Sequence, residues 1–177
     1  MKNWIIYSVL GLALSGVSFS AQAQSPVDLN DLEIAHVAYV ADNIDIQYAH
    51  LALALSDNPE IHEFARTMIR DHEAVNEQAL ALLTKLGAEA QDNFLSQKLI
   101  ADSKGIIDSL VGLRGAAFDK FYAENELGYH QAVNGLVGDT FIPNIENAEV
   151  KALFEAGLKI FQAHEEHATM MVTNLNK

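Results

Sequence analysis

The stretch that decides the fold runs from Pro59 to Leu86 and reads PEIHEFARTMIRDHEAVNEQALALLTKL, with Met68-Ile69-Arg70-Asp71-His72 at its centre. Residues on one side recur every three or four positions, the period of a buried helix face. This stripe consists of Ile61, Ala65, Met68, His72, Ala79, Leu83 and Leu86. It places an imidazole at the buried face, with the carboxylate of Asp71 beside it. Because burying unpaired polar groups is costly, we expect neighbouring helices to supply their partners.

Three more long helices are predicted around this one. The first begins after capping residues at Asp28 to Asn30 and reaches about Leu55. Asp45 lies next to its predicted buried stripe, which consists of Leu32, His36, Tyr39, Asn43, Ile46, His50 and Leu53. The connection to Pro59 is short, so these two helices form an antiparallel hairpin. The third helix is expected at about Ala117–Val137 and the fourth at about Ala148–Leu175, with a turn over 138–147 between them.

The connection between the second and third long helices is about thirty residues long. From Ala88 to Ala116 the apolar pattern weakens and indicates one or two shorter helical pieces, broken near Gly105 and ended by Gly112 and Gly115. No strand-like alternation occurs. The sequence therefore predicts an all-α four-helix bundle with ferritin-like topology, in which a helix-containing crossover joins helices two and three. A plain up-down-up-down bundle is the alternative.

The N-terminus has the features of a secretory signal peptide. Lys2 precedes a mostly apolar stretch from Trp4 to Phe19, and Ala21-Gln22-Ala23 is an Ala-x-Ala cleavage site. We therefore expect residues 1–23 to be removed and residues 24–177 to form the bundle domain. No later segment is apolar for long enough to span a bilayer, so we expect an exported periplasmic protein that does not insert into the membrane after cleavage.

Charge and cysteine content narrow the function classes. The 177-residue chain has a net charge of −13, which disfavours binding to nucleic acid and anionic lipid and suits cations or a basic protein partner. It contains no cysteine. Disulfides, thiolate metal sites and thiol redox chemistry are therefore excluded.

Counting residues outward from each turn predicts which polar side chains share a level of the bundle. Asp45 comes level with Asp71, close to His72, and His130 falls near mid-height with Glu126 one turn away. With a crossover, His164 and His167 come level with His50 and Glu126. The candidate metal ligands are Asp45, Asp71, His72, Glu126, His130, His164 and His167.

Histidine and carboxylate ligands on facing helices are what a bundle uses to bind zinc, iron or copper. His164 and His167 are three residues apart and can chelate one ion, and the thioethers of Met170 and Met171 follow directly. A standard di-iron centre needs two Glu-x-x-His motifs, and this chain has one, Glu33 to His36. The residues therefore favour a transition-metal site of another kind.

Two other interpretations stay open. Asp71, His72 and His130 could form a buried hydrogen-bond network that fixes helix register in a structural or interaction module. An atypical metal-dependent redox enzyme is a third interpretation. We expect metal binding without catalysis, in envelope metal handling or stress tolerance.

Four stretches resemble the bacterial family called domain of unknown function 4142. They are Asn43-Ile44-Asp45-Ile46 with Leu51-Ala52-Leu53, Phe64 to His72, Phe118-Asp119-Lys120-Phe121-Tyr122 with His130 beyond, and a histidine at 164 or 167. The resemblance covers about residues 30–175. It implies an exported, ferritin-like helical bundle and brings no assigned reaction. Asp45 stands where the family commonly has glutamate.

Overall fold

The computed structural model describes residues 24–177, and this range contains helices and no strand. The helices are η1 (Pro26–Asp28), α1 (Asp31–Leu55), α2 (Pro59–Leu86), α3 (Phe94–Gly112), α4 (Gly115–Leu136), the π-helical η2 (Val137–Phe141), α5 (Ile142–Asn144) and α6 (Ala148–Leu175). The predicted signal peptide, residues 1–23, lies outside the described residues. None of the helices within 24–177 is long and apolar enough to cross a membrane.

Four of the helices have an asparagine as their N-cap residue. Asn30, Asn58, Asn93 and Asn147 each accept hydrogen bonds from backbone N–H groups in the first turn of the helix that follows. These N–H groups have no partner inside the helix, so the caps define where the helices begin. Helix α2 ends at Gly87, whose φ of 62° is left-handed and favours glycine.

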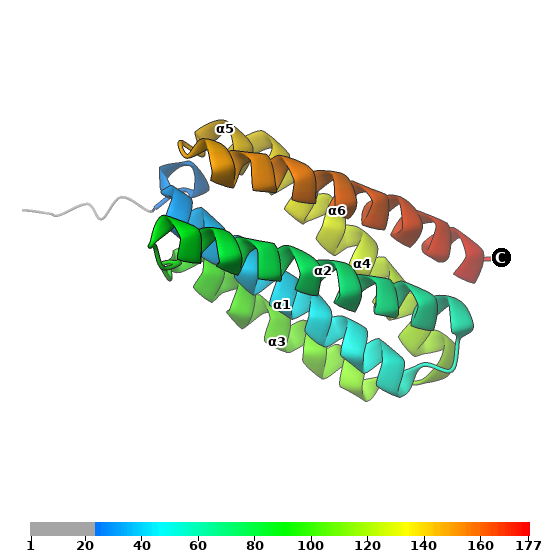
Figure 1. Cartoon of the computed structure of the whole chain (residues 1–177). Helices are drawn as coiled ribbons and strands as arrows, with labels where there is room; N and C mark the ends of the chain where they lie inside the picture. Colours follow the sequence, from blue (N-terminus) through cyan, green and yellow to red (C-terminus); the bar gives the residue numbers. More distant parts are fainter. Residues whose placement is uncertain (1–23) are drawn as a thin grey trace, which may run out of the picture.

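Helices α1, α2, α4 and α6 form the bundle, and α3 crosses it from end to end (Figure 1). After α2 has returned antiparallel to α1, α3 runs back along α1, so α4 starts at the same end as α2. Helices α2 and α4 are therefore parallel, and α1 and α6 run in the opposite direction. The four-helix bundle with a crossover is confirmed.

The crossover helix is longer and more regular than the sequence predicted. Helix α3 is one unbroken element from Phe94 to Gly112 and passes through Gly105 without interruption, so the expected break there is wrong. Asn93 caps its start, and Ile106, Ile107 and Leu110 pack on the core. Burial of these side chains outweighs the cost of about 1 kcal/mol for a glycine within a helix.

The buried face of α1 differs from the predicted stripe. Tyr39 and His50 are exposed and Asn43 is half-buried. The buried set is Ile34, Val37, Val40, Ala41, Asp42, Ile44, Asp45, Tyr48, Ala49 and Ala52. Because α2, α3 and α4 all contact α1, more than one face of this helix is covered and its apolar residues follow no narrow stripe. The face that carries Asp45 is the one that points inward.

The turn before α6 also differs from the prediction. The chain does not leave the helix at Val137 but continues through a π-helical turn and α5 to Asn144. Val137, Phe141 and Ile145 are buried here against Leu29 and Ile34. Their burial keeps the chain helical beyond the expected end, so the chain reverses later than residue counting assumed, although α6 begins at Ala148 as predicted.

Two apolar clusters fill the bundle. One surrounds Phe64, Met68 and Tyr122, and the other surrounds Ile34 and Phe141. Along α2, α4 and α6, buried polar residues at His72, His130 and His164 separate the two clusters. The polar layer therefore crosses the middle of an otherwise apolar core.

Candidate metal centre

His72 projects from α2 into the centre of the bundle, where its side chain is 4% exposed. Its Nδ1 donates to Asp42 Oδ1 at 2.7 Å. Its Nε2 lies 3.0 Å from Asp45 Oδ2, but out of line for a hydrogen bond, so this contact is ionic. Burial lowers the pKa of His72, while Asp45 and Asp42 raise it and prevail, giving a value of about 10. The ring of Phe161 stacks on it with centroids 4.7 Å apart.

His130 projects from α4 toward the same point and is 1% exposed. Its Nδ1 donates to the backbone carbonyl of Glu126 at 2.9 Å. This bond places the proton on Nδ1 and leaves the lone pair on Nε2, which lies 3.4 Å from Asp45 Oδ2. Burial lowers the pKa of His130 despite the nearby charge of Asp45. The ring is therefore neutral near pH 7.

His164 of α6 is held by a hydrogen bond to Asp71, a half-buried residue of α2. Its Nε2 donates to Asp71 Oδ2 at 3.0 Å, and Arg70 binds both oxygens of Asp71 at 2.7 and 2.9 Å. Nδ1 is buried and has no hydrogen-bond partner among the described residues. Burial lowers the pKa of His164 to about 4, and Asp71 offsets only part of that effect. The ring is neutral, with its lone pair directed inward.

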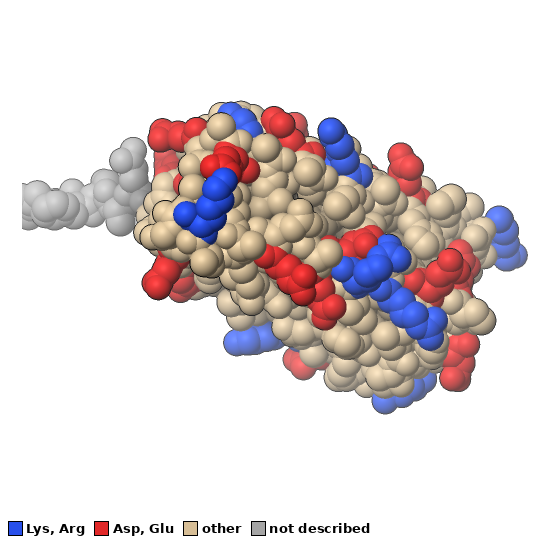
Figure 2. Space-filling model, viewed as in Figure 1, with Lys and Arg blue, Asp and Glu red and all other residues tan. Residues whose placement is uncertain are grey.

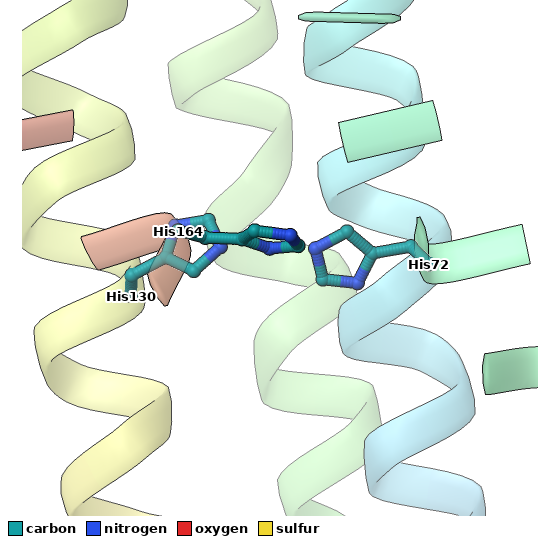
Figure 3. Close-up of side chains that lie close together, drawn as sticks. All are labelled: His72, His130 and His164. Atoms are coloured by element: carbon teal, nitrogen blue, oxygen red, sulfur yellow. The ribbon is translucent and has the colours of Figure 1, made fainter. Parts of the chain in front are cut away.

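The three rings come together from three helices (Figure 3). One nitrogen from each of His72, His130 and His164 lies within 4.8 Å of the others. In each ring one nitrogen is already held by a hydrogen bond to a carboxylate or a backbone carbonyl, namely Nδ1 of His72, Nδ1 of His130 and Nε2 of His164. Such second contacts are what fix the tautomer and orientation of metal-ligating histidines.

Two carboxylates complete the histidine–carboxylate cluster, which we define as His72, His130, His164, Asp45 and Glu126. Oxygens of Asp45 and Glu126 lie within 4.8 Å of each other and of a His130 nitrogen. Burial and the charge of Asp45 raise the pKa of Glu126 well above its ordinary range. The pKa of Asp45 is lowered, because the nearby histidines outweigh the effect of its burial.

Unpaired polar atoms are concentrated at this cluster. Within residues 24–177, both carboxylate oxygens of Asp45 and of Glu126, Nε2 of His72 and of His130, and Nδ1 of His164 are buried without a hydrogen-bond partner. Where no ionic contact compensates, as at the oxygens of Glu126 and Nδ1 of His164, such an atom costs about 1–3 kcal/mol, and native proteins leave few of them. Imidazole nitrogens and carboxylate oxygens converging on one point are the donor set of zinc, copper(II) and iron sites. The residues therefore fit a transition-metal ion.

The structure brings together five of the seven predicted ligands. Asp71 reaches the cluster only through His164 and is half-buried. His167 lies about one turn further along α6 and packs edge-on against Phe64, with ring centroids 5.1 Å apart. It belongs to neither group of converging ligand atoms. Of the predicted C-terminal pair, His164 is the one that faces the core.

Residue counting missed two features of the cluster. His164 lies against His130 rather than level with His50, because the helical extension to Asn144 shifts the midpoint between facing residues to about Asn147. Asp42 was not predicted as a member of the site. It could have been found from the spacing Asp42-x-x-Asp45, because residues three apart lie on the same face of a helix.

The methionines near the cluster do not join it. Met171 packs in the apolar core around Phe64, and Met170 is exposed. The arrangement therefore offers nitrogen and oxygen donors rather than thioethers. Such donors suit zinc and copper(II) better than reduced copper.

Comparisons with known proteins identify the family. The model of the domain of unknown function DUF4142 matches residues 17–171, so the chain belongs to this family, as its motifs predicted. No curated protein matches the chain. Among solved structures, "CopM in the Cu(II)-bound form" is similar, with a TM-score of 0.63, 16% sequence identity, and coverage of 82% of this chain and 97% of that one. At this identity the likeness shows a shared fold.

Proposed function

We propose that the protein binds one divalent transition-metal ion at the histidine–carboxylate cluster. The ligands are His72 Nε2, which releases its proton on binding, His130 Nε2, His164 Nδ1 and a carboxylate oxygen of Asp45, with Glu126 as a further oxygen donor. The observation that carries this proposal is the convergence of three imidazole nitrogens whose opposite nitrogens are already held. With Glu126 deprotonated, two carboxylates balance the charge of a divalent ion, and metal binding favours that form.

The donor set and the fold favour copper(II) or zinc. Three imidazoles with carboxylate oxygen suit both ions, and the absence of cysteine from the sequence removes the thiolate sites typical of reduced copper. The structure of CopM in its Cu(II)-bound form supports copper as one of the ions to test.

We propose a role in metal handling or stress tolerance in the cell envelope, without catalysis. The predicted signal peptide supports export. The ligands lie deep in the bundle, with His72, His130 and His164 no more than 4% exposed. An ion held there is shielded from solvent, which suits sequestration better than rapid exchange.

A structural role is the competing function. His72 lies between two carboxylates, with Nδ1 2.7 Å from Asp42 and Nε2 3.0 Å from Asp45. This arrangement alone could lock the register of α1 against α2. It leaves the oxygens of Glu126 and Nδ1 of His164 without partners among the described residues, and for this reason we place metal binding first.

Metal titration of the stripped protein separates the two functions. Copper(II), zinc and iron(II) are titrated in turn into wild type, His130→Ala/His164→Ala and the control His36→Ala/His50→Ala, and bound metal is measured by mass spectrometry. We expect one ion per chain in wild type and control, and loss of that ion in the cluster variant. Equal metal content in all three proteins, or none above surface binding, would overturn metal binding and favour the structural network.

A further inference from the structure

A cavity of about 170 Å³ lies inside the bundle beside the histidine–carboxylate cluster. Its walls come mainly from α1, α2, α4 and α6 and are almost entirely apolar. At one end it reaches Asp42 and Phe161, which both contact His72. The cavity is therefore separate from the metal ligands but borders the residues that hold one of them.

Small residues leave this space open. Ala35, Ala38, Ala79 and Gly157 line the cavity at positions where larger apolar residues would fill it. A Cβ added at Gly157 would lie 3.6 Å from Phe161 Cε2 and 4.0 Å from Val75 Cγ1, which are ordinary contact distances. Close helix packing therefore does not require glycine at this position.

One polar side chain in the cavity wall has an unmet hydrogen-bonding group. Asn76 is 7% exposed, and its Oδ1 has no partner among residues 24–177. A second polar group, the Tyr129 hydroxyl, already donates to the carbonyl of Ala41 at 2.9 Å. Because a buried amide oxygen without a partner is costly, Asn76 is the group in this wall that a ligand would satisfy.

We propose that this cavity binds a small apolar molecule that carries one hydroxyl group, such as a phenol. Cavities of about 150 Å³ lined by aliphatic and aromatic side chains bind benzene, so this volume accepts one six-membered ring with a small substituent. The apolar walls exclude charged ligands, whose desolvation would not be compensated. The hydroxyl donates to Asn76, and the ring contacts the apolar side chains around Gly157.

A route to solvent exists at the edge of the cavity. Tyr39 and Ala132 line it and are exposed. On the face viewed in Figure 2, acidic and basic side chains are scattered among uncharged ones and form no continuous layer.

Phenol and benzene are the probes that test this site. Each is titrated into the metal-free protein by calorimetry, and the methyl signals of Val75 and Leu153 in the wall and of Met170 outside it are followed by NMR. We expect saturable one-to-one binding, shifts at the wall methyls only, and about three- to tenfold weaker binding of benzene, which cannot donate to Asn76. Asn76→Leu is expected to remove the preference for phenol while keeping benzene binding.

A filling variant and its matched control complete the test. Ala79→Leu adds a side chain into the cavity, whereas Ala81→Leu makes the same change at an exposed position of α2. We expect Ala79→Leu to weaken phenol binding at least tenfold and Ala81→Leu to leave it unchanged. Non-saturable binding, shifts scattered over the surface, or equal binding by both variants would overturn the proposal. Because the metal-free protein is used, failure here leaves the proposed metal site untouched.

Discussion

His164 is fixed by Asp71 across the interface between α6 and α2, with Nε2 of the ring 3.0 Å from Oδ2 of the carboxylate. The bond commits the outer nitrogen to donation and turns Nδ1 toward His72 and His130. Arg70 in turn holds both oxygens of Asp71. A chain of contacts thus runs from the surface of α2 to a buried ligand atom of α6.

Removing Asp71 should weaken metal binding without removing a ligand. Loss of such an orienting carboxylate typically lowers metal affinity about 10- to 100-fold, and we expect this range for Asp71→Ala with copper(II) or zinc. The matched control is Glu73→Ala, an exposed carboxylate on the same helix. Competition titrations with a chelator measure both affinities. Equal affinities in the two variants would show that Asp71 does not position His164.

Replacing Glu126 should weaken metal binding without lowering the stability of the metal-free protein. Its carboxyl is fully buried, and its pKa is raised well above the ordinary range by burial and by Asp45. Glu126→Gln removes this titratable group, so the metal-free protein should be equally stable or more stable, while metal affinity falls. Thermal unfolding and titration are compared with Glu124→Gln, an exposed position of α4. An unchanged metal affinity in Glu126→Gln would contradict a metal role for Glu126.

His167 should contribute to packing alone. Its ring meets Phe64 edge-on with centroids 5.1 Å apart, a type of contact worth about 0.5–1.5 kcal/mol. We expect His167→Ala to lower the free energy of unfolding by about this amount and to bind one metal ion as wild type does. If His167→Ala lost the ion while His164→Ala kept it, the assignment of the inward histidine would be reversed.

The contributions of His72 and His164 to the stability of the metal-free protein should together be largest near pH 6.5. The pKa of folded His72 is about 10, above its ordinary 6.5, so its stabilising contribution is complete below pH 6.5 and is lost as the pH rises toward 10. The pKa of folded His164 is about 4. Between pH 6.5 and pH 4 this histidine is therefore protonated in the unfolded chain but neutral in the folded protein, so the free energy of unfolding falls as the pH drops through this range.

Urea unfolding at about pH 5, about pH 6.5 and about pH 9 measures this curve. One pKa unit corresponds to about 1.4 kcal/mol, so the alkaline loss should be on the order of a few kcal/mol. Asp42→Asn removes the charge that accepts from His72 Nδ1 and should reduce the alkaline loss, with part of it remaining because Asp45 still faces Nε2. An alkaline side that is unchanged in Asp42→Asn would show that this ion pair is not its source.

Much of the fold was predictable because its signals are local. The caps at Asn30 and Asn58, the stripe around Met68 and His72, and the length of the second connection each depend on residues close in sequence. The face of α1 was predicted wrongly because three helices cover it. The extension through Phe141 was missed because apolar burial against Ile34 decides it, and that contact joins residues far apart in the chain.

Part of the site was predictable by counting residues along the helices. His72, His130 and Asp45 fall at one level under any arrangement of the helices, so counting found them. The choice between His164 and His167 depended on the midpoint of the last turn, which shifts with the helical extension to Asn144. Asp42 required the correct rotation of α1, which the sequence pattern alone did not provide.

Anomalous X-ray diffraction from crystals grown with copper(II) or zinc tests the central claim most directly, because it locates the ion. We predict one strong anomalous peak about 2.0–2.3 Å from Nε2 of His72, Nε2 of His130 and Nδ1 of His164, with Asp45 as a further ligand. Peaks confined to surface carboxylates, with the three rings still paired as they are without metal, would contradict it.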